Sequence, residues 1–376
     1  MFNPTKDAVT FSLQELKRMK DENLAPESAL AALRKRADEY LAAGTLSVIH
    51  RHLKAPSGNP HDYTSMGPYW WPNPDTKDGL PYVNRDGYVN PEVKSEHTSG
   101  AAGGRAFNLA LAAFYFDDER YAEAAVKYLY DWYINPETYM TPHAKYAQAI
   151  PGICEGRGVG LIDFSGSYLT MNAVRLLEAM GMIDPVVVKG VEDWISTFTD
   201  WMLTDEIGVD EDNAGNNHGC WFDSQIITAA AFLGRRHLVK KIATTAYQRR
   251  YRLQIESDGS MPRELKRTKG IGYTFYALDA LMIIAYVARR AGFTEFITPD
   301  ETREGNILLR QAVDFIAPYA IDPSTFPYKE LYPDEKRASL GRLSYKMSGL
   351  FPGVGYEELY AKYMKEDSID RLLPNT

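Results

Sequence analysis

Hydrophobic residues recur along most of the chain at the spacing of one helix face. Leu13, Leu16 and Met19 follow this spacing and predict a helix over residues 12–22. Asp184 followed by Pro185 is the pattern of a helix start, because the carboxylate caps backbone N–H groups and proline fits the first helical position. The same kind of signal predicts further helices over residues 29–43, 101–116, 118–133, 167–180, 185–203, 220–233, 238–256, 274–290, 306–316 and 357–364.

Signals for β-strands are few. The sequence has no alternating apolar runs joined by hairpin turns and no strand–helix–strand rhythm. The predicted helices come in pairs joined by short loops, while residues 148–164 and 205–215 are expected to be irregular. Paired helices, roughly twelve to fourteen at this chain length, favour an all-α fold of the (α/α) toroid or barrel class over a simple bundle.

One long segment, residues 55–91, breaks the helical pattern. Pro, Gly, Asn and Asp recur in it, and it carries the run Pro68-Tyr69-Trp70-Trp71-Pro72. A loop of more than thirty residues is uncommon in a compact domain unless it has a function. We expect a lid or a binding rim that presents aromatic side chains. The alternative is an Ω-loop that packs its own tryptophan pair.

Composition narrows the class of protein. With 376 residues, 45% of them hydrophobic, the chain is long enough for a large core. The net charge of −8 disfavours nucleic acid as the main partner, although an acidic protein still binds a polyanion where Arg and Lys gather in one place. The 25 Tyr and 6 Trp fit a surface that stacks on sugars, and they fit core packing equally well.

Several other features are predicted to be absent. No run of 18 or more apolar residues occurs, so we expect no membrane span. The start of the chain lacks the pattern of a signal peptide. Cys154 and Cys220 are either free thiols or one disulfide. No pattern of metal ligands or of a phosphate-binding loop stands out, so we predict neither a metal nor a cofactor.

The most informative polar residues lie between positions 216 and 273. Asn217 and His218 stand where a loop meets a predicted helix, and Arg267 and Tyr273 follow about fifty residues later. An amide and a guanidinium hold a carboxylate, and an imidazole and a phenol move protons beside it. These residues also have structural interpretations. Asn217 would cap the helix, the cations around Arg267 would form a solvated surface, and Tyr273 would pack in the core.

These residues resemble the active-site pattern of the alginate lyases of polysaccharide lyase family 5. The chain is more similar to polysaccharide lyase family 38, because Arg267 precedes Tyr273 by six residues and because of the aromatic run at 68–72. The resemblance extends over residues 56–280 and includes the segments 148–152, 156–157 and 160–164. It implies an (α/α) barrel of seven helical hairpins that forms one catalytic domain over residues 1–376. It also implies a bacterial enzyme of the periplasm or the exterior.

The resemblance further implies a metal-independent lyase that acts on 1,4-linked polyuronates, either alginate or glucuronan, by β-elimination. Asn217 and Arg267 are then expected to bind and neutralise the substrate carboxylate. His218 is expected to act as a base or as a further charge stabiliser, and Tyr273 as the base, the acid or both. The residues expected to bind substrate are Gln148, Arg157, Arg263, Lys266, Tyr69, Trp70 and Trp71.

Two other functions remain open from the sequence. One is a glycoside hydrolase on the same kind of helical fold, which would use two carboxylates. The other is a sugar-binding protein without catalytic activity. A lyase would form a new double bond in its product, a hydrolase would add water instead, and a binding protein would form no product.

Overall fold

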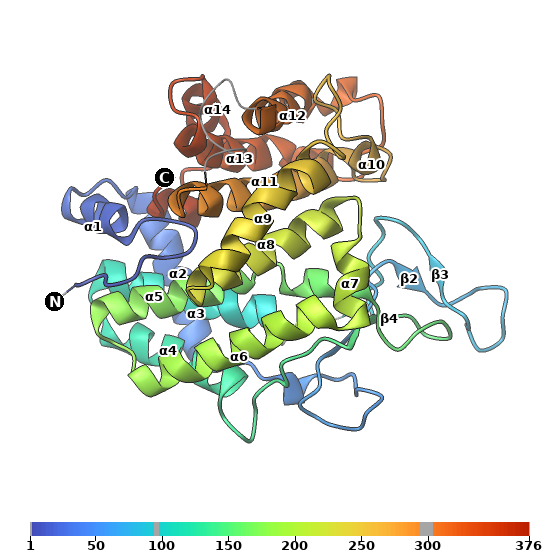
Figure 1. The fold of residues 1–376 in the computed structure, drawn as a ribbon, viewed down its shortest axis with the longest axis horizontal. Coiled ribbons are helices and arrows are strands. Elements are labelled where there is room, and N and C mark those ends of the chain that lie inside the picture. The colour runs from blue at the N-terminus through green and yellow to red at the C-terminus, as the bar shows by residue number, and fades with distance from the viewer. Residues whose placement is uncertain (1, 94–97, 294–303, 376) are drawn as a thin grey trace. The chain divides into compact units, whose positions relative to one another are not determined.

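The computed structural model describes residues 2–93, 98–293 and 304–375. Within these residues the chain folds into fourteen α-helices and four short β-strands (Figure 1). It forms two compact units, Met1–Lys6 with Lys35–Asn213 (unit 1) and Asp7–Arg34 with Ala214–Thr376 (unit 2). The helix α2 (Glu27–Ala43) is divided between them. The all-α prediction is confirmed, while the prediction of a single domain stays a prediction.

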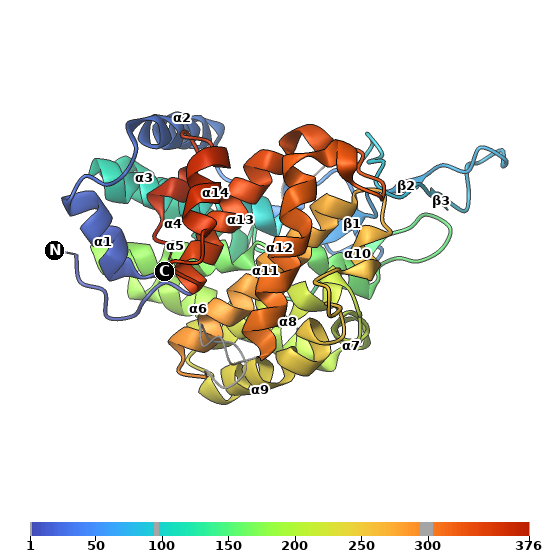
Figure 2. The same ribbon diagram turned by 90° about the horizontal axis from the view of Figure 1, so that it is seen from above.

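Unit 1 contains a layer of long antiparallel helices, and one short helix follows them along the chain. Asp184 caps the helix that begins at Pro185, as the sequence predicts, by accepting a hydrogen bond from the N–H of Val186. Asp118 caps the helix that begins at Glu119 in the same way, by accepting from the N–H of Arg120. The helix at residues 99–116 packs against the two helices that follow it, at residues 119–133 and 167–180, as Figures 1 and 2 show. The helices are α3 (Ser99–Phe116), α4 (Glu119–Tyr133), α5 (Ser167–Met180), α6 (Pro185–Thr204) and α7 (Glu206–Asp212).

The long loop of unit 1 contains small β elements. The strand β1 (Thr64–Met66) pairs in parallel with β4 (Tyr146–Ala149), which lies inside the segment expected to be irregular. The strands β2 (Trp70–Trp71) and β3 (Val83–Asn84) form an antiparallel pair that projects from the helices of this unit (Figure 1). The aromatic run is therefore carried by a short hairpin that is joined to the helical layer through β1 and β4.

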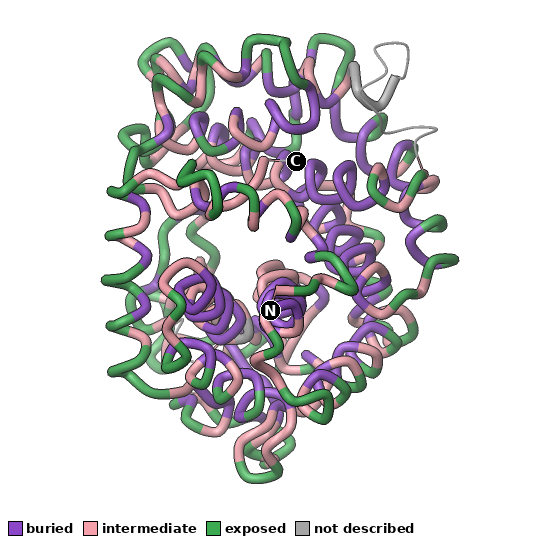
Figure 3. Tube along the Cα trace, turned by 90° about the vertical axis from the view of Figure 1, so that its left-hand side faces the viewer, coloured by how far each residue is buried: buried purple, intermediate pink, exposed green. Residues whose placement is uncertain are grey.

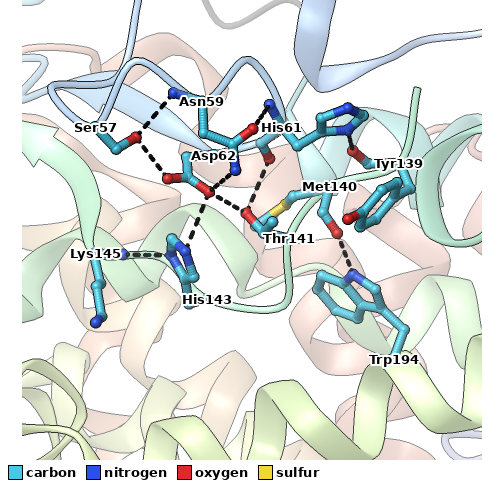
Figure 4. A network of polar contacts seen from close by, with 10 residues as sticks. All are labelled: Ser57, Asn59, His61, Asp62, Tyr139, Met140, Thr141, His143, Lys145 and Trp194. Carbon is cyan, nitrogen blue, oxygen red and sulfur yellow. Dashed lines mark hydrogen bonds and ion pairs between the residues drawn. The ribbon is translucent and has the colours of Figure 1, made fainter. Parts of the chain in front are cut away.

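Asp62 holds the first residues of this loop in place (Figure 4). Its buried carboxylate accepts hydrogen bonds from Ser57, Asn59 and Thr141 at 2.7, 3.0 and 2.5 Å. The Nε2 atom of His143 lies 3.2 Å from the same carboxylate. These contacts tie residues 57–62 to residues 141–143, so the loop starts from a rigid base.

Unit 2 is built around two apolar helices, α8 (Asn217–Phe232) and α11 (Gly270–Arg290), which lie side by side in Figures 1 and 2. Both are buried on nearly every face, which is why their sequences show little amphipathic contrast. The remaining helices are α1 (Leu13–Asp21), α9 (Arg236–Ala246), α10 (Pro262–Leu265), α12 (Glu304–Ile321), α13 (Lys336–Leu350) and α14 (Tyr356–Tyr363).

The helix α11 is long and apolar enough, by length and composition, to cross a membrane. However, 78% of its most apolar window is buried inside the protein. A core helix passes the same length and composition test, and the contacts of α11 with α8, α12 and α13 make it such a helix.

Several boundaries differ from the predictions. The expected acidic loop at 205–215 contains α7, because Asp205 ends α6 and then caps α7 by accepting from the N–H of Ile207. The predicted helix over 238–256 ends at Ala246 and continues as a π-helical turn, Tyr247–Tyr251. The helix α13 was not predicted, because its sequence is rich in Lys, Arg, Gly and Ser. Leu340, Leu343 and Met347 nevertheless bury one side of it.

Burial follows the helix faces that the apolar spacing predicts. In Figure 3, buried positions line one side of many helices and exposed positions line the other. In α1 the buried residues are Leu13, Leu16 and Met19, the three that predicted the helix. The apolar pattern of residues 12–22 therefore identified the inward face of α1 correctly.

Candidate active site

The first turn of α8 carries two of the predicted catalytic residues. Asn216 is the N-cap, because its side chain accepts a hydrogen bond of 3.2 Å from the N–H of His218. The capping role therefore belongs to Asn216, and the side chain of Asn217 is left for another contact. Asn217 is only 1% exposed, whereas His218 is half-buried at the surface of the helix start.

A buried carboxylate, Glu264 of α10, holds Asn217. Its Oε1 atom accepts the backbone N–H of Asn217 at 2.6 Å, and its Oε2 atom accepts Nδ2 of the Asn217 amide at 2.7 Å. Burial raises the pKa of Glu264, while the hydrogen bonds from Asn217 and the charges of Arg267 and His218 act in the opposite direction. Glu264 thus stands among three of the four predicted catalytic residues.

Arg267 and Tyr273, the other predicted pair, are in direct contact. The Nη2 atom of Arg267 donates a hydrogen bond of 3.0 Å to the phenol oxygen of Tyr273. The guanidinium carbon lies 4.1 Å from the centre of the tyrosine ring. Both side chains are partly exposed, so the phenol is held beside a cation and remains open to solvent.

The C-terminal segment fixes the start of α11, which carries Tyr273. Glu330 accepts the N–H of Gly272 at 3.0 Å and lies 3.3 Å from the amino group of Lys336. The N–H of Gly270 donates to the carbonyl of Lys329 at 3.0 Å. The helix begins at Gly270, four residues before the predicted start, so Tyr273 lies in its first turn.

A buried ion pair fixes the start of α8 in a similar way. The Nε and Nη2 atoms of Arg250 lie 2.8 and 3.2 Å from the two carboxylate oxygens of Asp223, and neither side chain is more than 2% exposed. The Nη1 atom donates to the carbonyl of Ala214 at 3.0 Å. A Cβ atom at Gly219 would collide with that carbonyl and with the guanidinium, so the close approach requires glycine.

The two other predicted cations are exposed. Arg263 of α10 donates a hydrogen bond to the carbonyl of Gly215, just before α8 begins. Lys266 follows α10 and is also exposed. The short segment that contains Glu264 thus carries three cations, of which Arg263 and Lys266 are exposed and Arg267 is partly exposed.

In unit 1, Gln148 and Arg157 are brought together. The Nε and Nη2 atoms of Arg157 donate to the carbonyl oxygen and to Oε1 of Gln148, both at 3.0 Å. The Nε2 atom of Gln148 donates to Asp163 at 3.0 Å, and its backbone N–H donates to Ser65 at 2.7 Å. Burial lowers the pKa of the Arg157 guanidinium, an effect that Cys154, Asp163 and Glu211 oppose.

The backbone of Gln148 adopts φ of 48°, a left-handed conformation that is uncommon for a residue with a side chain. Its side chain is 5% exposed, and both ends of its amide have protein partners. Gln148 therefore holds Arg157 in place, and Arg157, which is only partly buried, is the member of this pair that a ligand reaches more easily.

The aromatic residues of the hairpin, Tyr69, Trp70 and Trp71, are half-buried. The ring N–H of Trp71 donates to the carbonyl of Tyr88 at 3.0 Å, a contact within the loop itself. The guanidinium carbon of Arg157 lies 5.9 Å from the centre of the Trp70 ring. The loop thus packs part of its tryptophan pair, as the Ω-loop alternative proposed, and also leaves ring surface exposed.

Sequence reasoning missed Glu264 and Asp163. Glu264 stands inside a run of cations, and Asp163 lies in the segment 160–164, which is distinctive only through the family resemblance. Both make their decisive hydrogen bonds to residues far along the chain or across a loop, and no local pattern reveals such contacts. Among the described residues, no group of three or more His, Cys, Asp or Glu side chains could hold a metal ion. Cys154 and Cys220 are free thiols, and burial raises the pKa of Cys220.

Comparisons with known proteins place this chain in a family. The family model described as Alginate lyase matches residues 49–326. The crystal structure of an alginate lyase from Bacteroides ovatus is 31% identical in sequence, with a TM-score of 0.91, and the match covers 98% of both chains. None of the curated proteins matches the chain significantly.

More distant structures share the fold. Alginate lyase A1-III in an apo form is 15% identical, with a TM-score of 0.62 over 98% of this chain and 96% of that one. Its complex with a tetrasaccharide is 15% identical, with a TM-score of 0.58 over 93% and 95% of the two chains. This likeness confirms the (α/α) barrel class that the sequence predicted. With a family model that spans most of the chain and a relative that matches nearly all of it, the chain belongs to the alginate lyase family, whose members are polysaccharide lyases.

Proposed function

We propose that the protein cleaves 1,4-linked polyuronates, alginate and also glucuronan, by metal-independent β-elimination to give 4,5-unsaturated oligosaccharides. The observation that carries the proposal is the 3.0 Å contact between the Arg267 guanidinium and the Tyr273 phenol. It joins a cation that suits a carboxylate to a hydroxyl that suits proton transfer. Asn217 and His218, in the same unit, supply a further donor and a second titratable group.

The first requirement of the reaction is to acidify the proton on C5 of the uronate. That proton is barely acidic while the C6 carboxylate keeps its full charge. Asn217 and Arg267 would donate hydrogen bonds to this carboxylate and stabilise the doubly charged form that develops when the C5–H bond breaks. One such preorganised donor contributes about 3–4 kcal/mol to catalysis.

The second requirement is a proton path. Tyr273 would take the C5 proton, the C4=C5 double bond would form as the C4–O bond breaks, and the leaving oxygen would receive a proton. In β-mannuronate and β-glucuronate the C5 hydrogen and the C4 oxygen lie on one face, so Tyr273 alone would serve both steps. In α-guluronate they lie on opposite faces, so His218 would act as the base and Tyr273 as the acid.

The residues that we propose to bind neighbouring sugars are cationic or aromatic. Arg157, positioned by Gln148, and the exposed Arg263 and Lys266 would contact uronate carboxylates. The partly exposed rings of Tyr69, Trp70 and Trp71 would stack on sugar faces. The tetrasaccharide complex of alginate lyase A1-III supports a carbohydrate substrate of this class.

Two finer assignments belong to the same proposal. The six-residue spacing from Arg267 to Tyr273 and the aromatic run at 68–72 support membership of polysaccharide lyase family 38 within the wider family. A periplasmic or secreted location would bring the enzyme to its polymer, and we propose it on that ground.

The experiment is absorbance near 235 nm on mixing the protein separately with polymannuronate, polyguluronate and glucuronan, with and without EDTA. We expect a rise, which reports the 4,5-unsaturated product, and the same rate in EDTA. Tyr273→Phe should abolish the rise while oligosaccharide binding persists. If the folded wild type gives no rise in absorbance on any of the three polymers, the proposed function is refuted. If Tyr273→Phe retains substantial turnover, the proposed role of Tyr273 is refuted.

A further inference from the structure

Glu264 makes an unusual double contact with Asn217. The two residues are 47 positions apart, both are 1% exposed, and each carboxylate oxygen of Glu264 accepts one N–H of Asn217. The distances of 2.6 and 2.7 Å are those of charge-assisted hydrogen bonds. One bond fixes the backbone at the first turn of α8, and the other fixes the side chain.

The side-chain bond determines which end of the Asn217 amide faces which way. The amide oxygen and the amide nitrogen have almost the same shape, so packing alone does not distinguish them. An ionised carboxylate only accepts hydrogen bonds, so the NH2 end must face Glu264 and the oxygen must point away from it. The NH2 group has a second hydrogen, which Glu264 does not use.

We infer that Glu264 is a positioning residue that orients the Asn217 amide so that its second N–H, and not its oxygen, is offered to the substrate carboxylate. The inference rests on the proposed function, in which Asn217 donates to the C6 carboxylate. An amide turned the other way would place its oxygen against that carboxylate and repel it. Glu264 itself touches no substrate atom, so it acts through Asn217.

The surroundings of Glu264 favour its ionised form and so oppose the effect of burial. The charges of Arg267 and His218 and the N-terminal end of α8 stabilise the carboxylate, and the carboxylate in turn acts on the Cys220 thiol, whose pKa it helps to raise. Burial nevertheless raises the pKa of Glu264 above that of an exposed glutamate. Protonation converts one carboxylate oxygen into a donor and breaks the double contact, so orientation is lost as the pH falls through that raised pKa.

The principal test is Glu264→Gln, in which one acceptor becomes an NH2 group that favours the turned amide. We expect kcat to fall about 10- to 100-fold, with a smaller change in KM, because the lost interaction matters most in the transition state. In an Asn217→Ala background the same substitution should change kcat less than about twofold, since the two residues act as one unit. Losses that add in the double variant would overturn the inference.

Asp131→Asn is the matched control. Asp131 is a buried carboxylate of unit 1 that accepts from Thr45 at 2.5 Å, from Lys127 at 2.6 Å and from Asn135 at 3.1 Å, and none of these three partners belongs to the candidate site. It tests the general effect of neutralising a buried carboxylate. We expect its kcat to equal that of the wild type, whereas a loss equal to that of Glu264→Gln would show a purely structural effect and refute the inference.

Two further readouts keep the inference testable if Glu264→Gln does not fold. In the wild type, kcat should decrease at low pH, which is the acid limb of its pH profile. This decrease should be absent from Asn217→Ala, which retains Glu264 but has no amide to orient. The side-chain amide signals of Asn217, assigned by their loss in Asn217→Ala, should shift with pH in wild-type protein. The inference would be overturned if Asn217→Ala kept the acid limb of the kcat profile, or if the Asn217 amide signals did not shift with pH.

The amide signals also separate this inference from the proposed function. If the wild type cleaves no polyuronate, the proposed function fails, and the pH response of the Asn217 signals still decides whether Glu264 orients the amide. If the wild type is active and Glu264→Gln is equally active, the inference fails and the proposed function stands.

Discussion

Substitution of Arg267 by lysine tests whether the guanidinium does more than supply a positive charge. In the structure, Nη2 of Arg267 donates to the Tyr273 oxygen at 3.0 Å while the guanidinium carbon lies 4.1 Å from the ring centre. Lysine keeps the charge, but its ammonium group is a point charge on a flexible stem and cannot bind a phenol and a carboxylate with a rigid fork.

The expected magnitude follows from the contact that is lost. A hydrogen bond to a charged group contributes about 1.5–3 kcal/mol, and each 1.36 kcal/mol of barrier is a factor of ten in rate. If the contact is made in the transition state, Arg267→Lys should lower kcat about tenfold to a hundredfold. The change in KM should be smaller, because lysine still attracts the uronate.

The assay is the initial rate of absorbance increase near 235 nm over a range of polymannuronate concentrations. The control is Arg252→Lys, an exposed arginine of unit 2 outside the candidate site, which should leave kcat unchanged. A kcat for Arg267→Lys within twofold of the wild type would show that only the charge at position 267 matters, and the argument from geometry would then be wrong.

Two further predictions concern stability. Asp223→Ala leaves the buried Arg250 guanidinium without its carboxylate and should lower the free energy of unfolding by about 3–5 kcal/mol, measured by urea denaturation; a loss below 1 kcal/mol would contradict a buried ion pair. Burial lowers the pKa of His143, against the influence of Asp62 and Asp205, so the folded state favours the neutral ring. Stability should therefore fall as the pH drops below about 6.5, where the unfolded histidine takes up a proton. His143→Gln should reduce this dependence, and an identical pH dependence in the variant would exclude His143 as its source.

The sequence by itself determined most of the helices and the inward face of α1. The apolar spacing of α1 and the aspartate cap of α6 are local signals, and the structure follows both of them. Local signals sufficed because these features depend on residues within one or two turns. The helix α13 escaped prediction because packing, rather than intrinsic pattern, stabilises it. The short helix α7 escaped prediction although Asp205 caps it, because its sequence is mostly acidic.

The candidate catalytic residues were also found in the sequence, through residue types and a family resemblance. The sequence left open whether Asn217 caps a helix and whether Arg267 and Tyr273 meet. The structure assigns the cap to Asn216 and brings Arg267 onto Tyr273. Their proposed catalytic roles stay predictions until activity is measured.

Only the tertiary structure revealed the groups that support these residues. Glu264 contacts Asn217 across 47 positions, and Glu330 contacts the start of α11 across 58. A carboxylate is common in any sequence, and its role depends on which donor it meets and on how much water the fold removes from around it. Burial and long-range contact are properties of the folded chain, and for that reason the sequence indicated the candidate catalytic residues but not the residues that hold them in place.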